Sequence, residues 1–280
     1  MEWLTDNKIP VGIWAKNLVD WLTDNAAWFF DGISDTLEVI IAGILFVLEA
    51  PHPFIIVGAA TLLAFFIHRT IPFTLFVLVA LLLIINQGYW EETTETLSLV
   101  IAAALVCMVF GVPLGVAAAH RPRLFAVMRP ILDLMQTIPT FVYLIPALIL
   151  FGLGMVPGLI ATVIFAIPAP IRLTQLGVSS TPKALLEAGE AFGATGWQLL
   201  WKVELPYALP NIMAGLTQTI MLSLSMVVIA ALVGADGLGV PTLRALNTVN
   251  IAKGFEVGLA IVLIAIVLDR FIRKEGKGTV

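Results

Sequence analysis

The chain has 280 residues, of which 60% are hydrophobic and 12% are charged, and it carries a formal net charge of −4. With a mean hydropathy of +1.02, it has too few polar side chains to cover a soluble globule. We therefore expect a membrane protein built from helices, because unpaired backbone groups are too costly in lipid. We expect no nucleic-acid partner.

Residues 1–50 predict a tail on the outer side of the membrane, since they hold eight acidic and two basic residues. Within this tail, Trp14, Trp21 and Trp28 recur every seven residues along a helix that begins at Pro10. This pattern is typical of an amphipathic helix lying among lipid headgroups. The tail is either a contact with lipid or another subunit, or a solubilising extension, and both alternatives stay open.

Apolar runs bounded by charged or turn residues predict the membrane spans. They lie near residues 54–68, 70–86, 97–118, 131–152, 157–176, 211–233 and 255–271. The run at 37–48 is short for a span and is the candidate for an eighth. We expect an all-α fold, a polytopic transmembrane helical bundle of about seven spans within a range of six to eight.

The distribution of Lys and Arg predicts the orientation, because basic loop residues near span ends stay in the cytoplasm. With the carboxyl terminus inside, eleven of the fifteen basic residues face the cytoplasm. Seven spans then place the amino terminus outside, and Glu91, Glu92 and Glu95 fall on an outer loop. We expect a multi-pass protein of the cell inner (cytoplasmic) membrane, with an external amino terminus and a cytoplasmic tail at residues 273–280.

The loop between the fifth and sixth predicted spans is too polar to cross a membrane and predicts two short helices with a hinge. Thr181 is expected to cap the first helix, and Gly193 to end it in the left-handed conformation. Thr195 and Gln198 form a capping box for the second helix, which Pro206 is expected to close.

The same loop carries a spaced motif. Its residues are Glu187-Ala188-Gly189, then Gly193, then Val203-Glu204-Leu205-Pro206. This spacing resembles the EAA loop of ABC-importer permeases, whose pattern is EAA, three residues, G, nine residues, I, one residue, LP. Gly189 stands where the second alanine is usual, and Val203 where isoleucine is usual.

The resemblance implies a coupling role for the loop. By this resemblance, Glu187 would face basic residues of a separate ATPase, while Ala188, Phe192 and Gly193 would fill a cleft in it. A glycine hinge suits this role, because it keeps the angle of the docking helix adjustable. Residues 207–210 would then pass the motion into the sixth span. The other motif positions of the ATPase-coupling loop are Gly189, Val203, Leu205 and Pro206.

The resemblance also implies an organisation for the chain. Residues 51–96 would be accessory transmembrane spans, and 97–272 the ABC permease transmembrane domain, with the cytoplasmic coupling loop at 178–210. The chain would be a transport subunit without ATPase activity and without a cofactor, because ATP would be bound by the partner ATPase subunit. An external substrate-binding protein, a homodimer of permease subunits and membrane lipid would be its other partners.

Three further stretches narrow the resemblance. Residues 132–139, 141–154 and 223–239 are similar to the ProW-like permeases of glycine betaine, proline betaine and choline importers. The amino-terminal part of the chain most resembles the members that import choline. The resemblance thus implies import of choline, glycine betaine or a related quaternary ammonium solute.

The predicted fourth span holds our candidates for the translocation path. Pro139 and Pro146 are expected to interrupt its helix, and broken helices in bilayers usually line a cavity or abut another helix. Phe141, Tyr143 and Phe151 could meet a trimethylammonium group by cation–π contact, worth about 0.5–2 kcal/mol per ring. The alternative is that these rings face lipid or pack against other helices.

Other residues of the chain predict packing rather than chemistry. Cys107 lies inside a span and is expected to pack there. The three histidines have no metal-ligand spacing, so we expect no metal site. Asp133 lies four residues after Arg129, the spacing of a helical ion pair. Gly111 and Gly115 form a small-xxx-small pair that lets helices approach closely.

Two other functions are alternatives to the importer. An ion-coupled secondary transporter would want paired intramembrane acids or an inverted repeat, and neither is visible in the sequence. A membrane-embedded enzyme would need a catalytic pair, and the sequence shows none. A nucleotide site on this chain is not expected either, because Gly276-Lys277-Gly278-Thr279 lacks the first glycine of a phosphate-binding loop and follows no strand.

Overall fold

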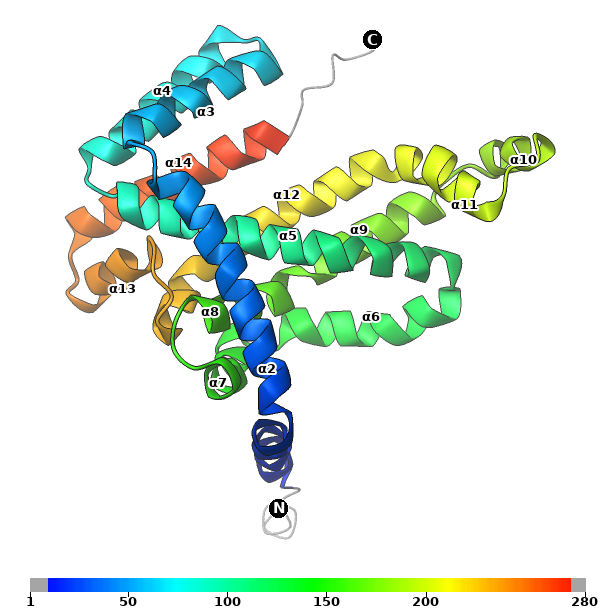
Figure 1. Ribbon diagram of the computed structural model, residues 1–280, viewed down its shortest axis with the longest axis horizontal. Helices are drawn as coiled ribbons and strands as arrows, with labels where there is room; N and C mark the ends of the chain where they lie inside the picture. The colour runs from blue at the N-terminus through cyan, green and yellow to red at the C-terminus, as the bar shows by residue number, and fades with distance from the viewer. Residues whose placement is uncertain (1–9, 273–280) are drawn as a thin grey trace, which may run out of the picture.

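The computed structural model describes residues 10–272, and within this range all regular secondary structure is helical (Figure 1). The helices up to the coupling loop are α2 (Val11–Glu49), α3 (Pro53–His68), α4 (Ile71–Asn86), α5 (Trp90–His120), α6 (Pro122–Thr137), α7 (Thr140–Phe151), α8 (Met155–Ala166) and α9 (Pro168–Ser179). They are followed by α10 (Lys183–Ala191), α11 (Gly196–Leu199), η1 (Leu200–Glu204), α12 (Leu205–Ala230), η2 (Ala231–Val233), α13 (Gly239–Asn247) and α14 (Ile251–Ile272). The predicted tail 273–280 lies outside the described residues.

Each of the seven predicted spans falls within this set of helices. Four stretches are long and apolar enough to cross a membrane: Trp90–His120, Met155–Ser179, Gly196–Val233 and Ile251–Ile272. Two further pairs, α2 with α3 and α6 with α7, pass the same criterion together, but each pair is bent by 94°. Helix α4 is also apolar, but it is shorter than these four stretches. The all-α membrane bundle is therefore confirmed, and the count of seven spans is approximate.

The centre of the bundle is formed by α5, α9 and α12, which pack closely along their lengths. A Cβ added at Gly111 would lie 2.8 Å from Pro170 Cγ, and one added at Gly115 would lie 2.7 Å from the Ile171 carbonyl oxygen. The two glycines of α5 therefore allow the backbone of α9 to approach, as their spacing predicted. Cys107 is fully buried on the same helix and packs there.

The coupling loop lies at one end of this bundle. In Figure 1, α10 and α11 project beyond the ends of α9 and α12, while α7 and α13 lie at the opposite end. Helices α3 and α4 form an antiparallel pair on one flank. This pair shares an apolar cluster with α14, which includes Val57, Val77 and Ile264.

Helix α2 differs from the predicted tail. It runs for 39 residues, and its helical backbone is interrupted at Ala26 (φ −126°, ψ 17°). Leu37 and Ile41 are buried against Ala102 and Leu159 of the bundle. The part of residues 1–50 after the interruption is thus not a free tail, because its apolar run 37–48 covers part of α5 and α8. The predicted arc of Trp14, Trp21 and Trp28, in contrast, is exposed.

The predicted span 131–152 is not one helix. It is broken between α6 and α7, where Ile138 adopts an extended conformation (φ −66°, ψ 132°). Pro139 causes the break, because it lacks an N–H and pushes the preceding residue out of the helical region. The expectation for Pro146 was wrong, since α7 continues through it.

Candidate functional site

The coupling loop begins with α10, which ends in a glycine motif. Gly193 has φ +77°. Its N–H donates to the Glu190 carbonyl at 2.8 Å, and the Ala194 N–H donates to the Gly189 carbonyl at 3.1 Å. These two bonds form a Schellman motif, which satisfies carbonyls at the end of the helix. The predicted left-handed conformation of Gly193 is confirmed.

The beginning of α10 differs from the prediction. Thr181 was expected to cap it, but Pro182 is the residue that precedes the first helical turn, and no side chain caps that turn. The Thr181 hydroxyl is buried and has no hydrogen-bond partner among the described residues. An extended Pro182 (ψ 132°) moves the start of the helix one residue along the chain, so Thr181 no longer occupies the capping position.

The second helix of the loop has the predicted capping box. The Gln198 N–H donates to Thr195 Oγ1 at 3.4 Å, and the Thr195 N–H donates to Gln198 Oε1 at 2.9 Å. The expected end at Pro206 was wrong, because α11, η1 and α12 follow one another without a break. The π-helical turn η1 explains this continuity. Its Leu205 N–H reaches back to the Leu200 carbonyl, and Pro206 then occupies the first turn of α12, where no N–H is needed.

The two arms of the loop pack against each other at Gly189. A Cβ at this position would lie 2.5 Å from Leu199 Cδ2 and 3.9 Å from Val203 Cγ2. Leu199 is buried, and Val203 is partly buried. Glycine at the second alanine position of the motif therefore lets α10 lie close to α11 and η1.

The outer surface of the loop presents the remaining motif residues. Glu187, Ala188 and Gly193 are exposed, and Phe192 is the most exposed large apolar side chain of the molecule's described part, at 94%. An apolar ring fully in solvent, beside an exposed carboxylate, is a feature of surfaces that meet another protein. Leu205 is partly buried, while Pro206 is exposed at the start of α12.

One contact between two side chains at the coupling-loop end of the bundle was not predicted. His120, the last residue of α5, lies with its Nε2 atom 2.8 Å from Glu204 Oε2 and 3.1 Å from Oε1. The two residues are 84 positions apart in the chain, so no local spacing could have indicated this contact. Glu204 occupies the variable position of the motif, directly before Leu205 and Pro206.

The aromatic residues predicted for the path have separate surroundings. The Tyr143 hydroxyl donates to the Met135 carbonyl at 2.5 Å and lies 3.3 Å from the Ile138 carbonyl oxygen. It thus satisfies backbone carbonyls that the break at Pro139 leaves without helical partners. Phe151 packs edge-to-face on Phe30 of α2, with ring centroids 5.5 Å apart. Phe141 is exposed on α7.

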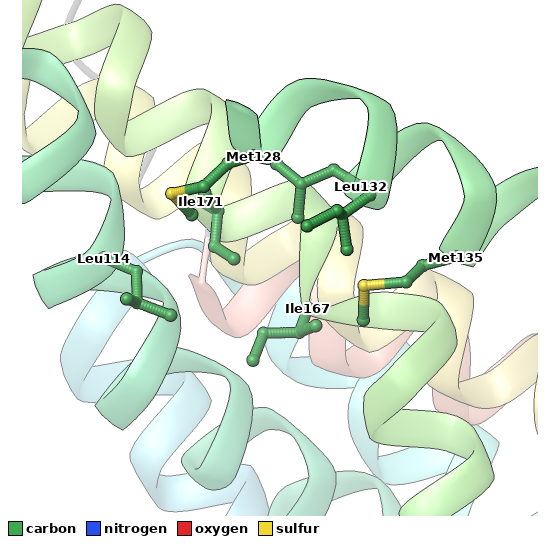
Figure 2. A pocket seen from close by; sticks show the side chains of 7 residues that line it. Leu114, Met128, Leu132, Met135, Ile167 and Ile171 are labelled. Atoms are coloured by element: carbon green, nitrogen blue, oxygen red, sulfur yellow. The ribbon is translucent and has the colours of Figure 1, made fainter. Parts of the chain in front are cut away.

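A groove of about 180 Å³ lies beside the central helices instead. Figure 2 shows side chains of α5, α6 and α9 converging on it. Its lining is apolar and consists of Leu114, Met128, Ile131, Leu132, Met135, Ile167 and Ile171. None of the five predicted path residues lines this groove, and it offers no aromatic face to a cation.

The ion pair predicted for Asp133 has a different partner. Arg172 of α9, rather than Arg129 of the same helix, donates to the Asp133 carboxylate at 2.5 Å. The tertiary contact between α6 and α9 places the guanidinium there. This pair ties the start of the bent segment to the central helix α9.

The end opposite the coupling loop is acidic. Glu91, Glu92, Glu95 and Asp236 line a hollow there together with Arg244 and with Gly237 of the glycine-rich turn at residues 234–239. Nearby, the Tyr89 hydroxyl donates to Glu256 at 3.3 Å. Burial, together with the Glu256 carboxylate, raises the pKa of Tyr89. Among the described residues, no group of three or more His, Cys, Asp and Glu side chains could hold a metal ion.

A bundle of membrane helices with an exposed, hinged helix at one end defines a class of protein, the membrane-spanning subunit of a binding-protein-dependent importer. Residues 111–273 match the family described as "Binding-protein-dependent transport system inner membrane component". The chain belongs to this family. Its members are transport components rather than enzymes, and they work with a substrate-binding protein and an ATPase.

Individual relatives agree with this assignment. The chain is 44% identical over 276 residues to the glycine betaine transport system permease protein OpuAB of Bacillus subtilis, covering 97% of this chain and 98% of the relative. It is 42% identical over 276 residues to the glycine betaine/carnitine transport permease protein GbuB of Listeria monocytogenes, covering 96% of each.

The fold is also similar to a solved structure. A chain from the inward-facing MetNI methionine ABC transporter superposes with a TM-score of 0.57 at 25% identity, covering 64% of this chain and 92% of that one. The chain is therefore an ABC-importer permease subunit of the inner membrane, as the loop motif implied, and not the ion-coupled secondary transporter considered as the alternative.

Proposed function

We propose that this permease imports glycine betaine or a related quaternary ammonium solute, choline included. The observation that carries the proposal is the identity of 44% to a glycine betaine permease along nearly the whole of both chains. Choline stays within the proposal as a member of the same chemical class. We assign the selection among these solutes to the external binding protein.

The coupling loop is proposed as the contact with the ATPase. Support comes from the exposed Phe192 at the end of α10, the glycine hinge behind it and the packing of α10 on Leu199. Such a unit can enter a cleft as one body. Glu187 and Ala188 lie on its exposed part.

The charges at the two ends of the bundle support the proposed orientation. Arg121 and Arg123 line a hollow beside the end of α5 at the coupling-loop end, whereas the hollow at the far end is mainly acidic. The positive-inside rule then favours a cytoplasmic coupling loop, a cytoplasmic carboxyl terminus and an external amino terminus.

Assembly as a homodimer and contact with lipid complete the proposal. One coupling loop per chain and two ATPases per importer call for two copies related by two-fold symmetry. For lipid, the support is the exposed Trp14, Trp21 and Trp28 on the first part of α2, because indole rings suit the boundary between lipid and water.

Reconstitution tests the proposed substrate. The permease, its ATPase and its binding protein are placed in proteoliposomes, and uptake of labelled glycine betaine, choline and methionine is measured with and without internal ATP. We expect ATP-dependent uptake of a quaternary ammonium solute and none of methionine. Uptake driven by an ion gradient without ATP, or uptake of methionine alone, would overturn the proposal.

A further inference from the structure

The contact between His120 and Glu204 joins the end of α5 to the π-helical turn η1. His120 ends α5, and its side chain is 46% exposed, while the Glu204 side chain is 10% exposed. Both carboxylate oxygens lie within 3.1 Å of the imidazole Nε2 atom. A carboxylate this deep needs a partner, because a buried unpaired charge is costly.

The π-helical turn sets the direction of Glu204. Each residue of an α-helix turns by about 100°. One extra residue in η1 therefore rotates α11 and the chain before it relative to α12. Directly below the pair, an apolar layer forms from α5, α9 and α12. Its members are Met108, Val112, Val116, Ala119, Val178, Leu205, Ala208 and Ile212. Glu204 therefore lies at the rim of this layer, with His120 above the same rim.

The position of the pair matters for transmission of movement. A force on α10 passes through η1 before it reaches α12, and a π-helical turn is a local irregularity that marks a point of bending. The contact between His120 and Glu204 holds the π-helical turn to the end of α5. Helix α5 is in turn fixed to α9 by the close approach at Gly111 and Gly115.

We propose that His120 and Glu204 are positioning residues for coupling: their contact makes the π-helical turn and α5 move together when the ATPase moves the loop. The inference rests on the proposed coupling role of the loop. The proposal assigns neither residue a contact with solute or nucleotide. Loss of the contact should leave ATP hydrolysis in place while less of the movement reaches the central helices.

The test measures solute imported per ATP hydrolysed by the full importer in proteoliposomes. His120→Ala and Glu204→Gln remove one partner or its charge, and the double variant His120→Glu with Glu204→His exchanges the two groups. We expect this ratio to fall about tenfold in the single variants, the scale of losing one charged hydrogen bond. In the exchanged variant, the ratio should recover. Glu38→Gln, an exposed carboxylate on α2, serves as the matched control.

The outcomes separate this inference from the proposed function. If the single variants assemble with the ATPase and keep the wild-type ratio while Gly193→Val lowers transport, the loop couples and the pair does not. If Gly193→Val is also without effect, the loop itself is not the coupling element. If His120→Ala, Glu204→Gln and the exchanged variant all fail to assemble, the pair maintains the fold rather than coupling, and the inference is overturned.

Discussion

At the scale of single residues, the backbone of Gly193 is the most specific feature of the coupling loop. Its φ of +77° lies in the left-handed region, and a Cβ at this position would contact nothing within 4 Å. Glycine is therefore needed at this position because of its backbone conformation, and not because a side chain would lack space. A β-branched residue is strongly disfavoured there.

Gly193→Val is expected to misplace α10 and to lower ATP-dependent solute uptake sharply. The backbone cost is about 1–2 kcal/mol, enough to favour another loop conformation. Gly196→Val is the matched control, because Gly196 also has open space around its Cβ position but no positive φ. Solute binding to the external protein should be unchanged. Uptake at the wild-type rate by Gly193→Val, measured at equal membrane insertion, would contradict the coupling role.

Tyr143 is expected to act through its hydroxyl. Tyr143→Phe keeps the ring but leaves the Met135 carbonyl without this donor. We expect a loss of about 1 kcal/mol in stability, the usual net value of one hydrogen bond, measured as a lower midpoint of thermal unfolding in detergent. Tyr207→Phe removes the same group from an exposed residue and should have little effect. Equal midpoints for the two variants would show that the hydroxyl does not brace the bend.

At the scale of elements, the contact of α5 with α9 depends on two positions without side chains. Gly115 is the stricter one, because a Cβ there would meet a backbone oxygen, that of Ile171, at 2.7 Å. A backbone atom held in a helix cannot move aside as a flexible side chain can.

Gly115→Ala should therefore separate α5 from α9 and cost about 1–3 kcal/mol, the range found for overpacked sites. Thermal unfolding of the purified chain measures it. Gly58→Ala is the control, since Gly58 lies in a helix with open space at its Cβ position. The prediction fails if both variants unfold at the same temperature.

Local patterns predicted several elements of the fold and of the loop. The small-xxx-small pair, the capping box at Thr195 and the left-handed Gly193 depend on neighbours within a few positions, so the sequence contains their causes. The partner of Asp133 and the contact of His120 with Glu204 depend on helices far apart in the chain. For the same reason, the burial of Leu37 in what was expected to be a tail could not be predicted from its surroundings.

At the scale of the whole molecule, the two ends of the bundle differ in charge, and this difference leads to a prediction of topology. A reporter fused to the carboxyl terminus should behave as cytoplasmic, and one fused near Asn7 as external. A cysteine introduced at Phe192 should react with a membrane-impermeant thiol reagent only in inverted vesicles.

An internal reporter at Asn7 would contradict an odd number of spans. In that case α2 would have to cross the membrane, which would make the run 37–48 the eighth span. The cysteine at Phe192 serves as the independent measurement, because it reports the side of the coupling loop without reference to the amino terminus.

The uninterrupted run from Gly196 to Val233 has a mechanical consequence. It contains 38 residues, and at 1.5 Å per residue it is about 57 Å long. Beyond the point of bending at η1, the rod formed by α12 behaves as a lever, in which a tilt of a few degrees at Leu205 becomes a displacement of a few ångströms at Ala230. The far end of this rod leads into the glycine-rich turn, where the Leu238 N–H donates to Thr96 Oγ1 at 2.8 Å. A displacement that begins at the coupling loop would thus be larger when it reaches the opposite end of the bundle.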